Sequence, residues 1–327
     1  MPMPATHSPT RRQGAAITVL ALLVGAPAFA AEFAYVPNQA SGTISVIDTA
    51  RDEVVRTLHG EGKLGTRVRG VVVDRGDKTL FVIDAEGGKV NVIDLTTDKL
   101  RKQIAVGHGP EGIGISPSGD RVAACVEDDN WVTLVDTRSL EVVKHIPVKG
   151  KNPEHCVFSP DGRWLLASNE NSNDVDVIDL KVGASLGTVK SSGHPRGMAF
   201  LPGTTTAYVA AETANAVDVL DVIARKLVRS IPTALRAAGA VASPDGKFVY
   251  IANGGAGSVS VIDVAANKSV AEIPVGKRPW NMAVTHDGRK LYVANGRSNS
   301  VSVIDTAARK VVKEIAVGEL PWGVDIP

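Results

Sequence analysis

Charged and aromatic side chains recur in this chain at intervals of about 42 residues, and they are its best candidates for chemistry. One recurring position reads Arg69, Glu111, Glu154, Arg196, Ala238, Trp280 and Trp322. The residue that follows this position is glycine in most copies, but it is His155 and Asn281 in two. The residue two places before the first position is His194, Arg236 and Arg278 in three copies. Guanidinium groups bind carboxylates and phosphates, and tryptophan rings supply flat apolar walls. A histidine beside a glutamate can transfer protons or bind a metal.

We predict that these side chains surround one ligand-binding site. Its predicted members are Arg69, Glu111, Glu154, His155, Arg196, Arg236, Arg278, Trp280, Asn281 and Trp322. The alternative is structural: the two glutamates could form salt bridges between repeats with Arg69 or Arg196, while the tryptophans pack against the scaffold. The residue types alone leave both interpretations open.

A second recurring set is largely acidic. It comprises Asp84, Glu86, Glu127, Asp128, Asp129, Asn169, Glu170 and Glu212. A cation site needs several converging oxygen atoms, and three consecutive acids cannot all point inward. We therefore interpret this set as a solvated acidic rim.

These intervals come from an internal repeat. A hydrophobic-hydrophobic-Asp motif ends at Asp48, Asp94, Asp136, Asp179, Asp221, Asp263 and Asp305, with spacings of 46, 42, 43, 42, 42 and 42 residues. Because the aspartate recurs in every copy, we interpret it as a turn residue whose carboxylate accepts backbone N–H groups, not as a catalytic residue.

One repeat reads as four short strands. In the last full copy they cover Trp280–Thr285, Lys290–Ala294, Ser300–Ile304 and Lys310–Val317, and the third alternates with period two as a half-buried strand should. No helical periodicity intervenes. Four strands per 42 residues predict an all-β, seven-bladed β-propeller with four-stranded antiparallel blades.

The two ends of the repeat region are complementary. The chain enters the fold at a second strand, Phe33–Val36, and its last segment, Pro321–Ile326, is a first strand. We expect the two terminal strands to share one blade and close the ring, so that no sheet edge stays unpaired.

Several segments carry a recognisable signature. Tyr292–Asn295 reads Tyr-Val-Ala-Asn, with echoes at Tyr35–Asn38 and Tyr250–Asn253, and Ser-Pro-Asp-Gly turns start at Ser159 and Ser243. The chain resembles the YVTN-type seven-bladed propeller repeat family over its whole mature length. Members of that group with similar blade starts accompany periplasmic quinoprotein alcohol metabolism, which implies an accessory role. The vicinal cysteine pair and tryptophan-rich motif of quinoprotein dehydrogenases are absent, so we predict no bound quinone and no other cofactor.

The first thirty residues resemble an export signal. Arg11 and Arg12 precede an apolar run from Ala15 to Val24, and Ala28-Phe29-Ala30 matches a cleavage site. We predict a cleaved signal peptide at residues 1–30, a propeller at residues 31–327 and a periplasmic location. Loss of the signal leaves 34 basic and 35 acidic residues.

Composition excludes several classes of partner and cofactor. A net charge of +1 for the whole chain lacks the basic footprint of nucleic-acid binding, and no apolar run is long enough for stable membrane insertion. Two cysteines cannot build a cysteine-rich zinc site or an iron–sulfur cluster, and no Cys-x-x-Cys-His attaches a haem. We expect Cys125 and Cys156 to be buried in small or apolar positions, and a disulfide between them stays open. A self-closed ring predicts a monomer.

The main functional prediction is an exported, non-catalytic binding or scaffold module. One axial face would bind a small anionic ligand or a periplasmic partner protein, as an accessory to quinoprotein-type oxidation. The absence of a nucleophile–base motif favours this prediction.

Two alternatives use the same face. A lactonase or lyase would use His155 or Glu154 as acid/base, Arg196 to stabilise an oxyanion and Glu212 nearby. A calcium-dependent form would instead recruit Glu111, Asn169 and Glu170. The other alternative is a carrier of a redox cofactor such as a tetrapyrrole, with His155 or His194 as axial ligand.

Overall fold

The structure, a computed structural model, describes residues 1–5, 32–60, 64–74, 76 and 78–327. The chain divides into two units, Met1–Ala30 and Ala31–Pro327, and all 27 described strands belong to the second. Residues 6–30 of the predicted signal peptide lie outside the described residues. Within the described part of the chain, no helix is long and apolar enough to cross a membrane.

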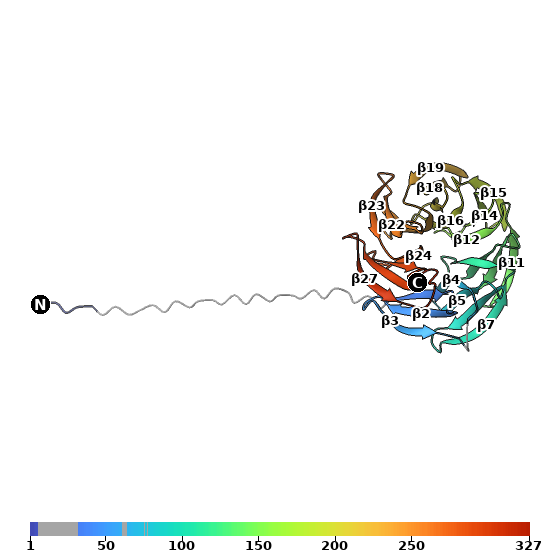
Figure 1. The fold of residues 1–327 in the computed structure, drawn as a ribbon. Helices are drawn as coiled ribbons and strands as arrows, with labels where there is room; N and C mark the ends of the chain where they lie inside the picture. Colours follow the sequence, from blue (N-terminus) through green and yellow to red (C-terminus); the bar gives the residue numbers. More distant parts are fainter. Residues whose placement is uncertain (6–31, 61–63, 75, 77) are drawn as a thin grey trace. The chain divides into compact units, whose positions relative to one another are not determined.

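Seven antiparallel sheets stand around one axis (Figure 1), as the repeat predicts. The first sheet holds β1 (Phe33–Asn38), β2 (Thr43–Asp48) and β3 (Glu53–Leu58). The second and third hold β4 (Val68–Asp74), β5 (Thr79–Asp84), β6 (Lys89–Asp94), β7 (Lys99–Ala105), and β8 (Pro110–Ile115), β9 (Arg121–Val126), β10 (Trp131–Asp136), β11 (Glu141–Pro147). The fourth and fifth hold β12 (Pro153–Phe158), β13 (Trp164–Asn169), β14 (Asp174–Asp179), β15 (Ala184–Lys190), and β16 (Pro195–Phe200), β17 (Thr206–Ala211), β18 (Ala216–Asp221), β19 (Lys226–Pro232). The sixth and seventh hold β20 (Ala237–Ala242), β21 (Phe248–Asn253), β22 (Ser258–Asp263), β23 (Lys268–Pro274), and β24 (Pro279–Val284), β25 (Lys290–Asn295), β26 (Ser300–Asp305), β27 (Lys310–Ala316).

The third strand of each sheet is more buried than its alternating sequence predicts. In β26 the first five residues are buried, including Ser300 and Ser302, because each sheet is covered on both faces by its neighbours. The polar side chains find hydrogen-bond donors within the sheet. Asn295, the last residue of the Tyr-Val-Ala-Asn segment, donates its amide N–H groups to the hydroxyls of Ser300 (3.3 Å) and Ser302 (2.8 Å). The asparagine of the repeat therefore links the second and third strands of its sheet by side-chain hydrogen bonds.

The recurring aspartate closes the turn between the third and fourth strands. The Asp48 Oδ1 atom accepts the backbone N–H groups of Ala50 at 2.8 Å and Arg51 at 3.3 Å, and Asp136 does the same for Arg138 and Ser139. This confirms its interpretation as a turn residue.

The C-terminal segment completes the first sheet and closes the ring. Tyr35 and Asp325 exchange backbone hydrogen bonds of 2.8 and 3.0 Å, and Trp322 N donates to Pro37 O at 2.9 Å. These contacts are separate bridges flanking an irregular stretch, so the sheet has three regular strands plus this segment. A second link joins the seventh sheet to the first, since the Tyr292 hydroxyl and the Lys290 ammonium group (2.7 Å) both contact the Asp52 carboxylate.

We expect Tyr292→Phe to lower the free energy of unfolding by about 1–2 kcal/mol, because the buried Asp52 contact loses a donor. Tyr208 occupies the same position in β17, and no hydrogen bond from its hydroxyl is recorded among the described residues. Urea denaturation of Tyr292→Phe and Tyr208→Phe measures the difference. Equal loss in both variants would show that the Asp52 contact contributes nothing to closure.

Candidate functional site

One mouth of the central channel collects the charged positions of the repeat. Each innermost strand begins there, and each second strand ends there, because the two are antiparallel neighbours. The loop before the innermost strand thus faces the loop after the second strand of the same and adjacent sheets. This topology brings together side chains that are 16 to 66 residues apart in sequence.

Arg196 is the centre of the charged layer. Its Nη2 atom lies 2.6 Å from Glu154 Oε1, and its Nη1 atom lies 2.8 Å from Glu170 Oε1 and 3.4 Å from Glu212 Oε2. The three carboxylates outweigh the effect of burial and raise the pKa of Arg196. The predicted alternative of salt bridges between repeats therefore describes this residue correctly. Its guanidinium group is already occupied and is not free to stabilise an oxyanion.

Three guanidinium groups converge on Glu212, which is only 2 % exposed. Besides Arg196, Arg236 Nε lies 2.7 Å and Arg278 Nη2 3.3 Å from Glu212 Oε1. Burial alone would raise the pKa of Glu212, but the three cations prevail and lower it. With Glu170 also bound to Arg196, three guanidinium groups face two carboxylates, so this side of the mouth keeps a net positive charge.

Three residues on the positive side of the mouth adopt a backbone conformation that costs stability. His194, Arg236 and Arg278 have φ angles of 50°, 60° and 54°, in the left-handed region that suits Gly109 and Asn152 at equivalent positions. Leu320 shares the conformation, so it belongs to the turn itself. Bulky side chains at such a position cost on the order of 1 kcal/mol each. The polar side chains here are held at some expense of stability.

The opposite side of the mouth is acidic. Carboxylate oxygens of Glu111, Glu127 and Glu154 lie within 4.8 Å of one another, and Arg69 forms an ion pair with Glu111. Burial, only partly offset by Arg196, raises the pKa of Glu154 to about 8, and burial likewise raises that of Glu127. At neutral pH, Glu154 therefore retains a proton, and its buried Oε2 atom has no hydrogen-bond partner among the described residues.

His155 lies at the axis between these two sides. Its ring stacks on Trp322 from the C-terminal segment, with centroids 5.2 Å apart and an interplanar angle of 24°. Burial, together with Arg196 and Arg69, lowers the pKa of His155 to about 3, so the imidazole is neutral. The described residues give neither ring nitrogen a hydrogen bond; the nearest charged atom is Glu154 Oε1, 3.7 Å from Nε2. A neutral imidazole with free nitrogen lone-pair capacity is suited to bind a metal.

A cavity of about 320 Å³ extends down the axis from this stack. Its lining includes His155, Trp322, Asn281, Cys156, Met198 and Phe158. Glycines let the innermost strands approach closely there: a Cβ on Gly112 would lie 2.4 Å from the carbonyl oxygen of Glu154.

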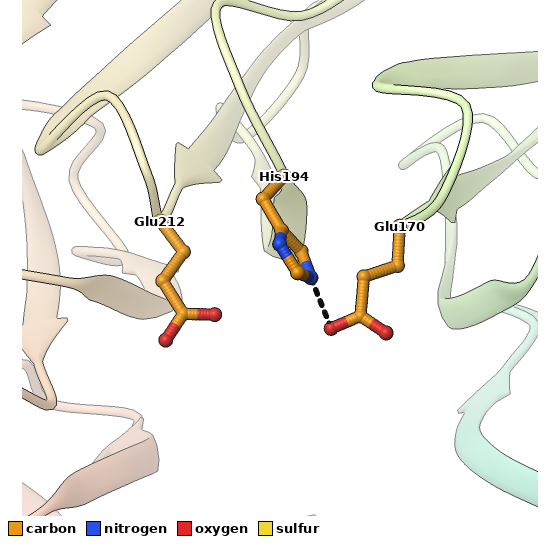
Figure 2. A group of neighbouring side chains, drawn as sticks. All are labelled: Glu170, His194 and Glu212. Atoms are coloured by element: carbon orange, nitrogen blue, oxygen red, sulfur yellow. Dashed lines mark ion pairs between the residues drawn. The ribbon is translucent and has the colours of Figure 1, made fainter.

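Figure 2 shows the group with the ligand types of a metal site, Glu170, His194 and Glu212. Their ligand atoms lie within 4.8 Å of one another, and His194 Nε2 contacts Glu170. However, the Arg196 guanidinium contacts both carboxylates of this group and already supplies a positive charge. The arrangement is a neutralised ion-pair network.

The calcium alternative stays a prediction, and the structure engages the amide nitrogen of one of its ligands, Asn169. The amide of Asn169 is turned into its own sheet, where Nδ2 donates to Asp174 Oδ1 at 3.0 Å and to Asp176 Oδ2 at 2.8 Å. Like Asn295, it links the second and third strands of its own sheet, and it does not join Glu111 and Glu170. The solvated-rim interpretation is wrong for Glu127, Glu170 and Glu212, which turn inward to the arginines. Their 16-residue offset from Glu111, Glu154 and Arg196 was the available signal.

The remaining predicted residues lie at the edge of the mouth. Trp280 packs over Gly296, where a Cβ would lie 2.3 Å from the ring, so this tryptophan contacts its own sheet and is only partly buried. Asn281 Nδ2 donates to Trp322 O at 3.3 Å and supports the axial stack. Both residues border the mouth without entering the charged layer.

Comparisons with known proteins match two halves of the chain to two propeller families. Residues 30–156 match the cytochrome D1 heme domain, and residues 179–316 match the seven-bladed β-propeller lactonase family. The first match contains the acidic side of the mouth and His155; the second begins after them. Neither description names the YVTN-type repeat, which stays a prediction.

The names of two similar curated proteins refer to heme d1 or to NirF. A dihydro-heme d1 dehydrogenase of Pseudomonas aeruginosa is 31% identical over 111 residues, covering 34% of this chain and 20% of that protein. Protein NirF of Stutzerimonas stutzeri is 24% identical over 149 residues, covering 40% of this chain and 37% of NirF. The chain thus spans a fifth to just over a third of these relatives. The solved structure of the dihydro-heme d1 dehydrogenase NirN in complex with DHE has the same fold, with a TM-score of 0.66 at 17% identity over 94% of this chain and 78% of that one.

These findings overturn the main functional prediction. A non-catalytic module for a small anion or a partner protein, accessory to quinoprotein-type oxidation, is not what the relatives indicate. The family match over residues 30–156 and the named relatives concern heme d1, a tetrapyrrole. Two of the arginines that this prediction treated as free anion binders, Arg69 and Arg196, are paired with buried glutamates in the structure.

We expect Arg196→Met to destabilise the protein by about 3 kcal/mol at pH 7, because it leaves buried carboxylates without their cation. The arginines hold the pKa of Glu212 below its ordinary value. The stabilisation that the arginines provide is therefore complete above the ordinary pKa of a glutamate. It is lost as the pH falls through the lowered pKa of Glu212. The difference between wild type and variant should shrink towards pH 4 in denaturation experiments.

Arg229→Met, on the exposed outer strand β19, is the matched control. An Arg196→Met variant as stable as Arg229→Met at pH 7 would contradict the central role of the network.

Proposed function

We propose that this propeller binds an iron tetrapyrrole of the heme d1 type at the charged mouth, where His155 would hold its iron. The observation that carries the proposal is the neutral, unpartnered imidazole of His155 on the channel axis. It lies at the end of the segment that matches the cytochrome D1 heme domain. When bound, such a group would supply redox or small-ligand chemistry at its iron.

The residues present fit such a group in their donor chemistry. An iron ligand must be a deprotonated imidazole nitrogen, and burial keeps His155 in that form over the whole physiological pH range. Trp322 stacks on one face of the His155 ring and fixes the plane of the imidazole.

The charge asymmetry of the mouth would orient the tetrapyrrole. Its carboxylate substituents would turn towards the positive side, where Arg236 is 58 % exposed in its side chain and retains unused N–H donors. On the acidic side, the carboxylates of Glu111 and Glu127 would repel them. An arginine forms paired hydrogen bonds with a carboxylate, which makes Arg236 and Arg278 the residues for this role.

The lactonase alternative has less chemical support. A general base works best when its pKa lies near the working pH, whereas that of His155 is about 3. The oxyanion donor proposed for it, Arg196, is already bound by three carboxylates. The lactonase family match also begins beyond Glu154 and His155.

Location in the periplasm is part of the proposal. The predicted signal peptide at residues 1–30 supports it, and expression with and without these residues followed by cell fractionation tests it. Protein in the periplasmic fraction only when the segment is present is the expected result.

We expect wild-type protein titrated with heme d1 to develop a shifted visible spectrum, and His155→Ala to bind it at least tenfold more weakly without the spectrum of an imidazole-ligated iron. His145→Ala, an exposed histidine on the outer strand β11, should behave as wild type. Absorbance titration measures both affinity and ligation. No spectral change with wild-type protein would overturn the proposed function, and an unchanged spectrum in His155→Ala would reassign the ligand.

We expect Arg236→Gln to weaken binding roughly fivefold, because one charge-assisted carboxylate contact is lost. The same variant should bind the methyl ester of the tetrapyrrole as well as wild type does, since the ester has no carboxylate to pair. Arg229→Gln on β19 controls for a general change in charge. Equal weakening with acid and ester would show that Arg236 does not contact the carboxylates.

A further inference from the structure

The two cysteines of the chain, distant in sequence, are neighbours in the structure. Cys125 lies in β9 and Cys156 in β12, the innermost strand of the next sheet. Both belong to one buried cluster between these sheets, together with Ile146, Leu165 and Ala167. Both are free thiols in the structure.

The contacts of Cys156 place its sulfur against the strand that carries Cys125. Its Sγ atom lies 3.8 Å from the carbonyl oxygen of Ala123, two residues before Cys125 on the same strand face. A second contact of 3.8 Å reaches Gly112 O on β8. Burial and the adjacent Cys156 thiol raise the pKa of Cys125. The two sulfur atoms therefore face the same layer between the sheets.

Cys156 has room to change rotamer. It lines the axial cavity of about 320 Å³, directly below His155, whereas Cys125 is completely buried behind it. The two contacts of its sulfur are long and weak, so they oppose a rotation towards Cys125 very little. Other sheets carry Ala210, Ala252 and Ala294 where Cys125 stands, so packing alone does not require a thiol at this position.

We propose that Cys125 and Cys156 form an intramolecular disulfide that staples the third sheet to the fourth beneath the mouth. Two S–H bonds break, one S–S bond forms, and two protons and two electrons pass to a disulfide oxidant such as oxidised glutathione or a thiol–disulfide oxidoreductase. The bond closes a loop from residue 125 to residue 156 and restrains β12, the strand that carries Glu154 and His155. This inference is independent of the tetrapyrrole proposal.

Burial determines when the bond forms. Exchange requires a thiolate, and the fully buried Cys125 thiol resists ionisation in the folded protein. The disulfide is therefore expected to form during folding and to resist reduction afterwards.

The test is oxidative refolding. Denatured, reduced protein is refolded in a glutathione redox buffer, blocked with iodoacetamide and digested with trypsin without reductant. We expect peptides 122–138 and 152–163 to be joined within a monomer and to separate on reduction. Two alkylated cysteines in correctly folded protein, or the same peptides joined only between chains, would overturn the proposal.

A stability measurement provides a second readout. Reduction under denaturing conditions followed by refolding with reductant should lower the Tm of the wild type by on the order of 5 °C, because the loop constraint on the unfolded chain is lost. The Cys125→Ala/Cys156→Ala protein should show the same Tm with and without reductant. A wild-type Tm that is equally insensitive would count against the disulfide.

Discussion

Each sheet of this propeller is covered on both faces by its neighbours, and that constraint governs both the core and the site. Strands that would be half exposed in an open sheet are buried on both sides, so their polar residues must find partners inside the protein. The asparagine at the end of the second strand provides these partners in β1, β13, β21 and β25. The same constraint requires the ring to close, since an open end would expose a sheet face and an unpaired edge. The contacts of the C-terminal segment with Tyr35 and Pro37 meet that requirement.

Convergence at the axis concentrates charge that the sequence distributes over six repeats. Buried ion pairs contribute little net stability, because desolvation offsets their attraction. In this protein the ion pairs fix the positions of the side chains. Arg196 holds three glutamates in place, and three arginines hold Glu212. The mouth becomes a rigid, polar platform with a positive and an acidic side. Such a platform can orient a ligand that is itself asymmetric in charge.

The axial position of His155 connects this platform to function. In most sheets the equivalent residue is glycine, which the close approach of neighbouring strands requires. The histidine there stacks on Trp322, and neither of its ring nitrogens has a hydrogen bond among the described residues. Under such conditions an imidazole remains neutral and available to a metal. A disulfide directly beneath it, on the same strand, would limit its movement further.

Local pattern determined the fold: the 42-residue period, the alternating strands and the complementary ends are sufficient to specify seven blades and their closure. It also identified the repeat positions that converge, because deviations from a repeat stand out against their copies. Local pattern could not determine which charges pair. Glu127, Glu170 and Glu212 resemble surface acids in sequence, and only the packing of adjacent sheets turns them onto Arg196 and Arg69. Whether Asn169 faces the mouth or its own sheet depends likewise on one side-chain rotation. Ion pairing and protonation depend on distances of a few ångströms between separate repeats and on the removal of water, and tertiary structure alone sets both.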